Sequence, residues 1–314
     1  MGDAGKGNQS TVTEFIIVGF PGSPNLQVLY FFLFLIIYIT SIMANATIVL
    51  LVIIDHHLHT PMYALLANLS SLEIGYISVT VPKMLANFFS KSRAISYSGC
   101  LIQTYFFTFL GATEFFLLGL MSLDRYVAIC IPLHYSSIMR SQVCIKLVVA
   151  AWTGGFVTTF IPVLLITRLP FCGPNIIDHF FCEALPLLKL SCSSIYLQET
   201  VDIIFSSTVI LVSFLLTQVS YFFIIVTILK IPSTNGKCKA FSTCASHLIV
   251  VIIFYTTIFS MYLKQTENES SVNKVIAVLY AVIVPTLNPF IYSLRNKEIK
   301  EALRKLLNMS RSIF

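Results

Sequence analysis

The sequence predicts an all-α membrane protein, a seven-transmembrane helix bundle with a short amphipathic C-terminal helix. The chain of 314 residues is 56% hydrophobic and only 11% charged, whereas about 25% of the residues in a soluble domain are charged. Seven stretches also reach the ~20 apolar residues that a helix needs to cross hydrocarbon, and none alternates polar and apolar residues as a barrel strand does. The seven stretches are residues 26–54, 62–88, 100–131, 143–166, 200–231, 240–263 and 272–294.

These stretches divide the chain into three parts. Residues 1–25 form an extracellular tail, residues 26–295 the seven-transmembrane domain, and residues 296–314 an amphipathic cytoplasmic helix and tail. The first part lacks a basic n-region and a cleavage site, so no removable signal peptide is expected. With the N-terminus outside, Lys and Arg gather in the inner loops and the C-terminal part, as the positive-inside rule requires. We expect a multi-pass protein of the plasma membrane whose net charge of +6 reflects topology, not nucleic-acid binding.

The outer segments carry features of a secreted environment. Asn8 and Asn268 each begin an N-x-S sequon, and Asn8 is the better glycosylation candidate because Asn268 lies in a short loop near the bilayer. Four cysteines fall on the outer side, which allows three pairings. Zinc is disfavoured because ligand pairs usually stand two to four residues apart and these are more widely spaced. The four are Cys100, Cys172, Cys182 and Cys192.

The first two spans contain polar groups of different kinds. Asn45 stands in an apolar helix, and a buried amide there usually bonds a neighbouring helix. The following inner loop contains His56, His57 and His59, which suggest a metal site, but a loop anchor before a helix that starts at Pro61 is the better interpretation.

Acidic residues in the middle of two spans predict a functional pocket. Glu73 and Glu114 lie where an ionised group is costly and therefore functional by default. We expect them to hold a structural sodium ion with Asn288, or to share a proton there. The alternative is two protonated acids that donate hydrogen bonds between helices. No other cofactor is expected.

The third span ends in a charged pair. Asp124 and Arg125 follow a long apolar run, which indicates that the helix reaches water there. The pair can neutralise itself, and a partner that offers Arg125 a better contact can open it. Interfacial anchoring of the helix end is the simpler alternative.

The outer halves of several spans mix aromatic and small residues, as a core or a ligand cavity does. Apolar walls with a few hydroxyl groups suit a small, mostly hydrophobic ligand, and no acidic or basic residue is expected to face the outer cavity. In the seventh span Pro289 breaks the helical ladder, and we expect Asn288 to help satisfy it. In the segment that follows, apolar residues fall on one side of a helix and basic residues on the other, which predicts an amphipathic helix on the inner membrane surface.

Together these features resemble a rhodopsin-like G-protein-coupled receptor and, more closely, an olfactory receptor of the tetrapod-type class II branch. The family motifs are LHTPMY at residues 58–63, MSLDRYVAIC at 121–130, PLHY at 132–135, SY at 220–221, KAFSTCASHL at 239–248 and PTLNPFIYSLRNK at 285–297. They cover nearly the whole chain. The sequence departs from the family pattern at Ala44, at Ser122 and Leu123, and at Glu73, where the family favours Asp.

The resemblance implies a signalling mechanism at the inner face. Arg125 would be held by Asp124 at rest and would meet a stimulatory, olfactory-type heterotrimeric G protein when span six swings outward, which raises cyclic AMP. The implied coupling residues are Asp124, Arg125, Tyr126, Tyr221, Lys237, Lys239, His247, Asn288, Pro289, Tyr292 and Arg295.

The resemblance also implies an odorant pocket, two disulfides and a location. The pairing Cys100–Cys182 with Cys172–Cys192 is favoured, with Cys100–Cys192 as the alternative. Location in olfactory sensory cilia and binding of a small volatile odorant are expected, and Tyr255 is expected to sense it. The implied pocket residues are Phe107, Thr108, Gly111, Ala112, Phe205, Ser206, Tyr255, Ile258, Phe259, Tyr262 and Val278.

Rival functions are disfavoured. The seventh span lacks the lysine that a retinal pigment needs, the two halves show no inverted repeat of a transporter, and an enzyme is not expected. A non-olfactory small-molecule receptor of the same fold is the alternative.

Overall fold

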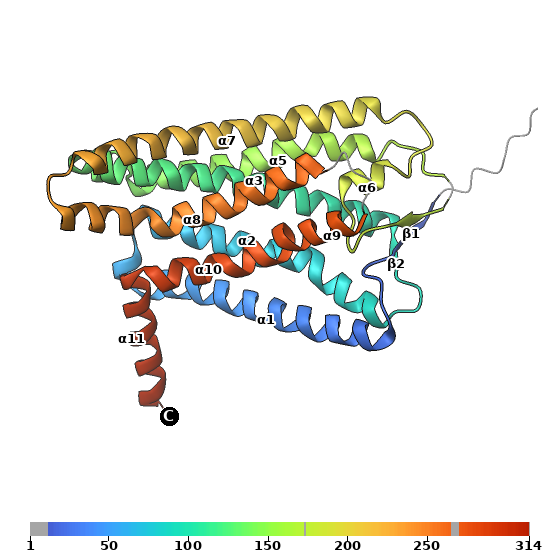
Figure 1. The fold of residues 1–314 in the computed structure, drawn as a ribbon, viewed down its shortest axis with the longest axis horizontal. Helices are drawn as coiled ribbons and strands as arrows, with labels where there is room; N and C mark the ends of the chain where they lie inside the picture. Colours follow the sequence, from blue (N-terminus) through green and yellow to red (C-terminus); the bar gives the residue numbers. More distant parts are fainter. Residues whose placement is uncertain (1–11, 173, 265–269, 314) are drawn as a thin grey trace, which may run out of the picture.

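Seven long helical segments run alongside one another and form the body of the molecule (Figure 1). The structure is a computed structural model that describes residues 12–172, 174–264 and 270–313. Within these residues, seven segments are long and apolar enough to cross a membrane, which confirms the predicted fold class. The elements are β1 (Glu14–Ile17), α1 (Pro24–Ile54), η1 (His56–Leu58), α2 (Pro61–Phe89), β2 (Ala94–Ser96), α3 (Tyr97–Cys130), η2 (Pro132–His134), α4 (Tyr135–Ile138), α5 (Ser141–Ile166), β3 (Ile176–Ile177), α6 (Ala184–Leu188), α7 (Tyr196–Lys230), α8 (Thr234–Lys264), α9 (Ser270–Val278), η3 (Leu279–Ile283), α10 (Val284–Arg295) and α11 (Lys297–Ile313).

The spans are α1, α2, α3, α5, α7 and α8, and a seventh that combines α9, the π-helical turn η3 and α10. We call the end of the bundle that carries the three strands and α6 the outer end, and the end that carries α11 the inner end (Figure 1). The helix α7 begins at Tyr196, before the predicted residue 200, and α8 begins at Thr234, before the predicted residue 240. Hydropathy detects only the apolar part of a span, so it misses helical turns that extend beyond the hydrocarbon.

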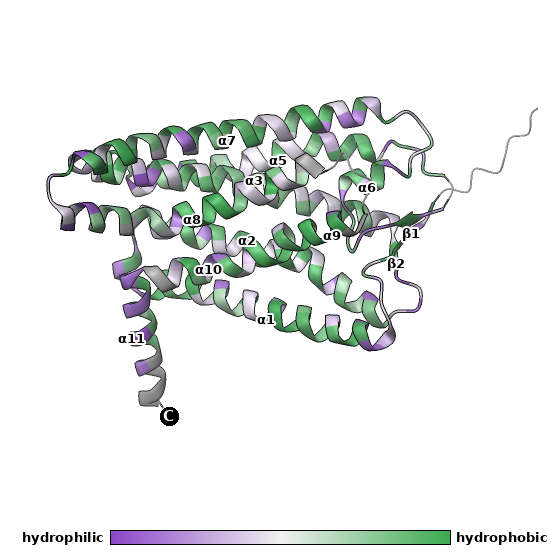
Figure 2. Ribbon diagram, viewed as in Figure 1, coloured by the Kyte–Doolittle hydropathy of each residue, from purple (hydrophilic) through white to green (hydrophobic). Residues whose placement is uncertain are grey.

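Large apolar side chains cover the outside of the bundle. Ile36 is 64% exposed, Ile53 66% and Leu215 58%. Figure 2 shows hydrophobic residues along most of each span and a concentration of hydrophilic residues on α11. An apolar surface of this extent belongs in contact with lipid, where each helix satisfies its own backbone groups. The chain is therefore a multi-pass membrane protein.

Asn45 binds a carbonyl group that a proline leaves without its helical donor. Pro289 has no N–H, so the carbonyl of Pro285, four residues earlier, lacks its usual partner. Asn45 Nδ2 donates to this oxygen at 3.1 Å, which confirms the interhelical role predicted for Asn45. The expectation that Asn288 would satisfy the broken ladder is wrong, because Asn288 Nδ2 donates to Glu73 Oε1.

A three-stranded sheet lies at the outer end, in addition to the predicted helices. The central strand β1 pairs antiparallel with β2 and parallel with β3. Phe15 and Ile17 of β1 are fully buried and pack with apolar residues of the loop between α5 and α7. The strands have four, three and two residues, too few for a recognisable alternating pattern in the sequence.

Two disulfides fix the loop between α5 and α7. Cys100 at the start of α3 bonds to Cys182, with Cα atoms 5.4 Å apart, and Cys172 bonds to Cys192, with Cα atoms 5.7 Å apart. This is the pairing that the family resemblance favours, and the alternative Cys100–Cys192 is absent from the described residues. The loop is thereby held across the outer end of α3.

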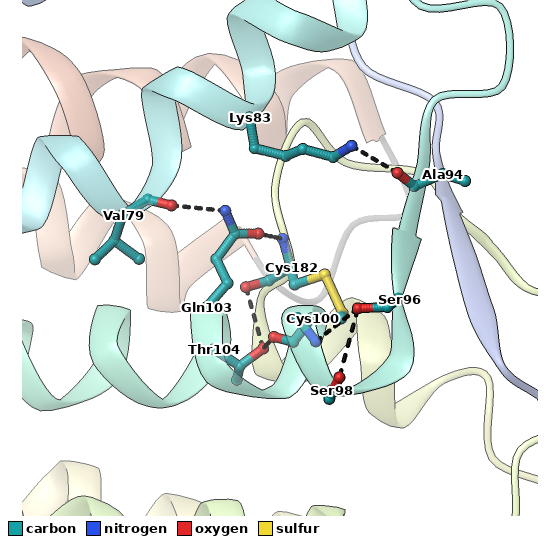
Figure 3. The surroundings of a disulfide bond; sticks show 10 residues. Val79, Lys83, Ala94, Ser96, Ser98, Cys100, Gln103, Thr104 and Cys182 are labelled. Carbon is teal, nitrogen blue, oxygen red and sulfur yellow. Dashed lines mark hydrogen bonds between the residues drawn. A yellow bond between two sulfur atoms is a disulfide. The ribbon is translucent and has the colours of Figure 1, made fainter.

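Side chains of α3 also bind the backbone of Cys182 (Figure 3). Gln103 Oε1 accepts a hydrogen bond from the N–H of Cys182 at 2.8 Å, and Thr104 Oγ1 donates to its carbonyl oxygen at 3.2 Å. Gln103 Nε2 donates in turn to the carbonyl of Val79 on α2 at 2.7 Å. The residues after Cys182 are therefore placed directly over the space between the spans.

The C-terminal helix α11 leaves the inner end at a steep angle to the spans (Figure 1). Its Ile299 and Ala302 are buried, while Lys300 and Arg304 are exposed. Lys305 Nζ lies 3.3 Å from Asp55 Oδ2 in the loop after α1. The predicted amphipathic helix is thus present and packs its apolar face on the bundle.

The histidine-rich inner loop is organised by Asp55. Its Oδ1 accepts hydrogen bonds from the backbone N–H of His57 at 3.0 Å and from His57 Nδ1 at 2.9 Å. These two bonds, of which the one from the backbone N–H has the larger effect, lower the pKa of Asp55 to about 2. Pro61 then occupies the first turn of α2. The geometry favours the loop-anchor interpretation of this segment.

Candidate functional site

The charged pair at the end of α3 is closed. Arg125 donates to Asp124 Oδ2 from Nη2 at 2.5 Å and from Nε at 3.1 Å. The Asp124 side chain is fully buried and that of Arg125 is 11% exposed. The hydroxyl group of Tyr135 on α4 donates to the other carboxylate oxygen of Asp124 at 2.8 Å. A buried carboxylate that is bonded on both oxygens keeps the guanidinium in one position.

The fifth and sixth spans meet beside this pair. The hydroxyl group of Tyr221 on α7 lies 2.7 Å from Nδ1 of His247 on α8, and their rings stack with centroids 5.9 Å apart. Tyr292 of the seventh span is also buried, and its hydroxyl group has no hydrogen-bond partner among the described residues. The three residues that the resemblance expects to rearrange around Arg125 therefore lie on three different spans of the inner end.

Of the remaining coupling residues, Tyr126 and Lys237 lie at the same end, and Asn288 lies deeper in the bundle, beside Glu73. The ring of Tyr126 packs against that of Phe223 with centroids 5.9 Å apart, and Lys237 is partly exposed near the start of α8. Pro289 lies inside α10. The side chains of Lys239 and Arg295 fall outside the described part of the chain, as do Asn8 and Asn268.

The three residues of the predicted acidic pocket, Glu73, Glu114 and Asn288, are buried inside the bundle. Glu73 is 1% exposed and Glu114 2% exposed, and Asn288 Nδ2 donates to Glu73 Oε1. Glu114 Oε1 and Asn45 Oδ1 are buried oxygens that have no hydrogen-bond partner among the described residues. Such oxygens favour a cation or a proton nearby, because a buried acceptor without a partner costs free energy.

A cavity of about 460 Å³ opens between α3, α5, α7 and α8 beneath the disulfide-linked loop. Seven of the predicted pocket residues line it, namely Phe107, Thr108, Gly111, Ala112, Phe205, Ser206 and Ile258. Gly111 and Ala112 are the small residues on the face of α3 that lines the cavity. Small-molecule sites usually have volumes of about 300–1,000 Å³, so the cavity is large enough for a small ligand.

Three other predicted pocket residues lie outside the cavity wall. Tyr255 is 4% exposed, and its hydroxyl group donates to Ser213 Oγ at 2.9 Å, so it is part of the contact between α7 and α8. Its ring packs against that of Phe115, which does line the cavity, with centroids 5.8 Å apart. Phe259 and Val278 are likewise absent from the wall. The side chain of Tyr262 is outside the described residues.

Several residues that line the cavity are absent from the set of implied pocket residues. They come from α2 (Tyr76), α5 (Thr158, Thr159 and Pro162), the loop with α6 (Glu183, Ala184, Leu185, Leu188 and Lys189), α7 (Glu199, Asp202, Ile203, Val209 and Ile210), α8 (Met261), the seventh span (Tyr280) and the deeper part of α3 (Phe115). The one sequence signal for Glu183 is its position directly after Cys182, which a disulfide to Cys100 holds at the outer end of α3. The expectation that no charged residue faces this cavity is wrong, because Glu183, Glu199, Asp202 and Lys189 all line it.

Of these charged residues, Glu183 is held by contacts to two neighbouring side chains. Its Oε1 accepts a hydrogen bond from the hydroxyl group of Tyr280 at 2.6 Å, and its Oε2 lies 3.5 Å from Nε2 of His179. Burial raises the pKa of Glu183 to about 7, the bond from Tyr280 opposes this shift, and the nearby Asp202 carboxylate adds to it. Burial also lowers the pKa of His179 to about 3, so this imidazole is neutral at physiological pH.

Comparison with known proteins identifies the family of this chain. A family model described as olfactory receptor matches residues 34–310. Human olfactory receptor 6N1 is 50% identical over 302 residues, which cover 96% of this chain and 97% of the relative. Human olfactory receptor 6Q1 is 51% identical over 307 residues, 96% of each chain, and mouse olfactory receptor 6B9 is 47% identical over 301 residues, 96% and 95%. The chain therefore belongs to the olfactory receptor family, whose members are G-protein-coupled receptors and not enzymes.

Proposed function

We propose that this odorant receptor binds a small volatile ligand in the cavity and activates a stimulatory heterotrimeric G protein of the olfactory type, which raises cyclic AMP. The observation that carries the proposal is that α3 belongs to both sites. It contributes Phe107 and Ala112 to the cavity and ends in the Asp124–Arg125 pair. From Ala112 to Arg125 the helix rises about 20 Å at ~1.5 Å per residue.

Activation in this proposal is a shift between two arrangements of the bundle. At rest Asp124 binds Arg125, and the contact of Tyr221 with His247 joins α7 to α8. A ligand that binds the other arrangement more tightly shifts the population toward it, whereas equal affinity for both would shift nothing. Arg125 then leaves Asp124 and contacts the G protein, and Tyr221, His247 and Tyr292 repack around it.

The transducer would dock at the inner end. Lys237, Lys239 and the region of Arg295 supply positive charge there, which favours contact with an acidic partner surface. We place the inner end in the cytoplasm and the outer end outside the plasma membrane of olfactory sensory cilia. Two disulfides at the outer end support this orientation, because disulfides persist in oxidising compartments.

The acidic pocket would hold a sodium ion in the resting state. Glu73, Glu114 and Asn288 offer oxygen atoms, the ligands that hard cations prefer. The two buried oxygens of Glu114 and Asn45 that lack hydrogen-bond partners among the described residues fit this use. A proton shared by the two acids is the competing interpretation.

A cyclic AMP reporter tests the proposal. Cells that express the receptor with an olfactory-type stimulatory G protein are exposed to a panel of volatile compounds, and receptor at the cell surface is measured in parallel. We expect at least one compound to raise cyclic AMP, and we expect Arg125→Ala to abolish that response while leaving surface expression intact. An undiminished response of this variant would refute the role of Arg125. Silence to every compound from receptor at the surface would count against the proposed ligand class.

A further inference from the structure

The outer part of the cavity has an excess of acidic groups. Glu183, Glu199 and Asp202 line it, against a single basic residue, Lys189. Lys189 is exposed and forms no ion pair with these acids among the described residues. Among the described residues, Glu199 and Asp202 form no ion pair, and Glu183 meets the neutral His179 and the hydroxyl group of Tyr280.

Tyr280 and the loop hold Glu183 in a defined position. The hydroxyl group of Tyr280 donates to Oε1 at 2.6 Å. The disulfide and the two hydrogen bonds at Cys182 fix the adjoining backbone. The cavity surface therefore includes a carboxyl group whose place is set from both the loop and the seventh span.

Asp202 provides the second acidic group from α7. It lies in the second turn of the helix and is half-buried. Within the part of the chain that the structure describes, its carboxylate has no hydrogen bond or ion pair; only its backbone oxygen is engaged, by the hydroxyl group of Ser206 at 2.6 Å. Asp202 is close enough to Glu183 to influence its protonation. Two neighbouring carboxylates in a partly desolvated site repel each other, so a cation between them is stabilised.

The rest of the cavity is apolar. Phe115 from α3, Val209 and Ile210 from α7, and Ile258 from α8 supply apolar wall, and Phe107 adds an aromatic ring beside the loop, with its centroid 4.6 Å from that of Phe181. A ligand in this cavity therefore meets acidic groups at one end and hydrocarbon and aromatic rings at the other. The cavity is thus complementary to a molecule with a positively charged head and an apolar body.

We propose that the receptor is selective for small amines, with the protonated nitrogen bound between Asp202 and Glu183 and the apolar body against Phe107, Phe115 and Ile258. This inference rests on the proposed odorant-receptor function. An ammonium group offers three donors and a positive charge, as the lysine side chain does. An alcohol of the same shape would leave Asp202 without a charged partner, and a carboxylate would be repelled by both acids.

Matched ligands test this selectivity. The probes are hexylamine, hexan-1-ol and hexanoic acid, with cyclohexylamine and cyclohexanol as a second pair, at neutral pH, where an alkylamine with a pKa near that of lysine, about 10.4, is protonated. We expect the amines to raise cyclic AMP at concentrations about ten- to a hundredfold lower than the matched alcohols, and we expect no response to the acid.

Variants of the two acids separate recognition from folding. Asp202→Asn and Glu183→Gln are expected to weaken the amine response about tenfold or more while the alcohol response stays within about twofold. Glu14→Gln, an equal loss of charge at an exposed outer residue away from the cavity, is the control and should change neither response. Surface expression is measured for each variant.

The outcomes distinguish this inference from the function on which it rests. Alcohols that activate the wild-type receptor better than amines, or amine responses that survive both substitutions, would overturn amine selectivity and leave the odorant receptor in place. Receptor at the cell surface that answers none of the probes, and none of a wider volatile panel, would overturn both. An amine response lost selectively in Asp202→Asn and Glu183→Gln would support the inference.

Discussion

The hydroxyl group of Tyr135 donates a hydrogen bond to Asp124 Oδ1 at 2.8 Å, on the carboxylate oxygen opposite the one that binds Arg125. Burial and then the Asp124 charge raise the pKa of Tyr135 further above physiological pH, so the phenol keeps the proton that it donates. The loop after α3 thus supports the resting pair, since it fixes the carboxylate that holds the guanidinium.

Removing this support should increase activity without ligand. Tyr135→Phe deletes one hydrogen bond to a charged group, and we expect basal cyclic AMP to rise about two- to tenfold. Asp124→Asn removes the charge itself and should raise it further. Tyr196→Phe, at a tyrosine that is 76% exposed at the outer end, is the matched control. Equal basal activity in all four receptors would show that the pair does not restrain signalling.

Tyr255 should affect all ligands alike. It lies behind Phe115 and bonds Ser213, so Tyr255→Ala removes a contact between α7 and α8 rather than a contact to the ligand. We expect the responses to every agonist, amine or alcohol, to weaken by a similar factor of about ten or more. Dose–response curves for two chemically different agonists check this. A loss confined to one of them would place Tyr255 in the binding site after all.

Sodium should stabilise the resting receptor through the acidic pocket. An ion that binds only the folded state adds about RT ln(1 + [L]/Kd) to stability, so we expect the Tm of purified receptor to be about 2–5 °C higher in sodium chloride than in choline chloride at equal ionic strength. Glu73→Gln and Glu114→Gln should abolish the difference. A wild-type receptor indifferent to the cation would favour the shared proton.

Glu183 should make stability depend on pH. Its pKa rises from the ordinary 4.5 to about 7 in the folded receptor, so the folded state binds the proton more tightly than the unfolded chain. Its contribution is therefore full below about pH 4.5 and is lost as the pH rises through about 7, by at most about 3 kcal/mol. His179 stays neutral over this range, and Tyr280 and Asp202 are the other groups that face Glu183.

Thermal unfolding of ligand-free receptor in detergent between about pH 5 and pH 8 checks this dependence. The Tm of the wild-type receptor should fall with rising pH, and that of Glu183→Gln should fall less. Parallel curves for the two proteins would assign the dependence to other groups.

The spans and the signalling residues were predictable because their signals are local. A run of about 20 apolar residues identifies a helix wherever its neighbours lie. Asp124 and Arg125 are adjacent in the sequence, and Glu73 and Glu114 are conspicuous in hydrocarbon. The family motifs supplied the disulfide pairing that counting cysteines left open.

The composition of the cavity was less predictable, because it depends on how distant segments meet. Glu183 is brought over the bundle by a disulfide that spans 82 residues, and Tyr280 faces it from a π-helical turn, where the helical period changes. Tyr255 shows the opposite error. Tyr255 lies on the inward face of α8, but a small rotation of this helix about its axis turns the side chain toward α7 and away from the cavity. Sequence periodicity does not resolve such a rotation.

The bond of Asn45 to the Pro285 carbonyl has a mechanical consequence. With the bond of Asn288 to Glu73, it ties α1, α2 and α10 together at mid-depth, and separating the helices would take these donors from the Pro285 carbonyl and the Glu73 carboxyl group. These three helices should therefore behave as a fixed frame, and the displacement that transmits the stimulus should fall on α7 and α8.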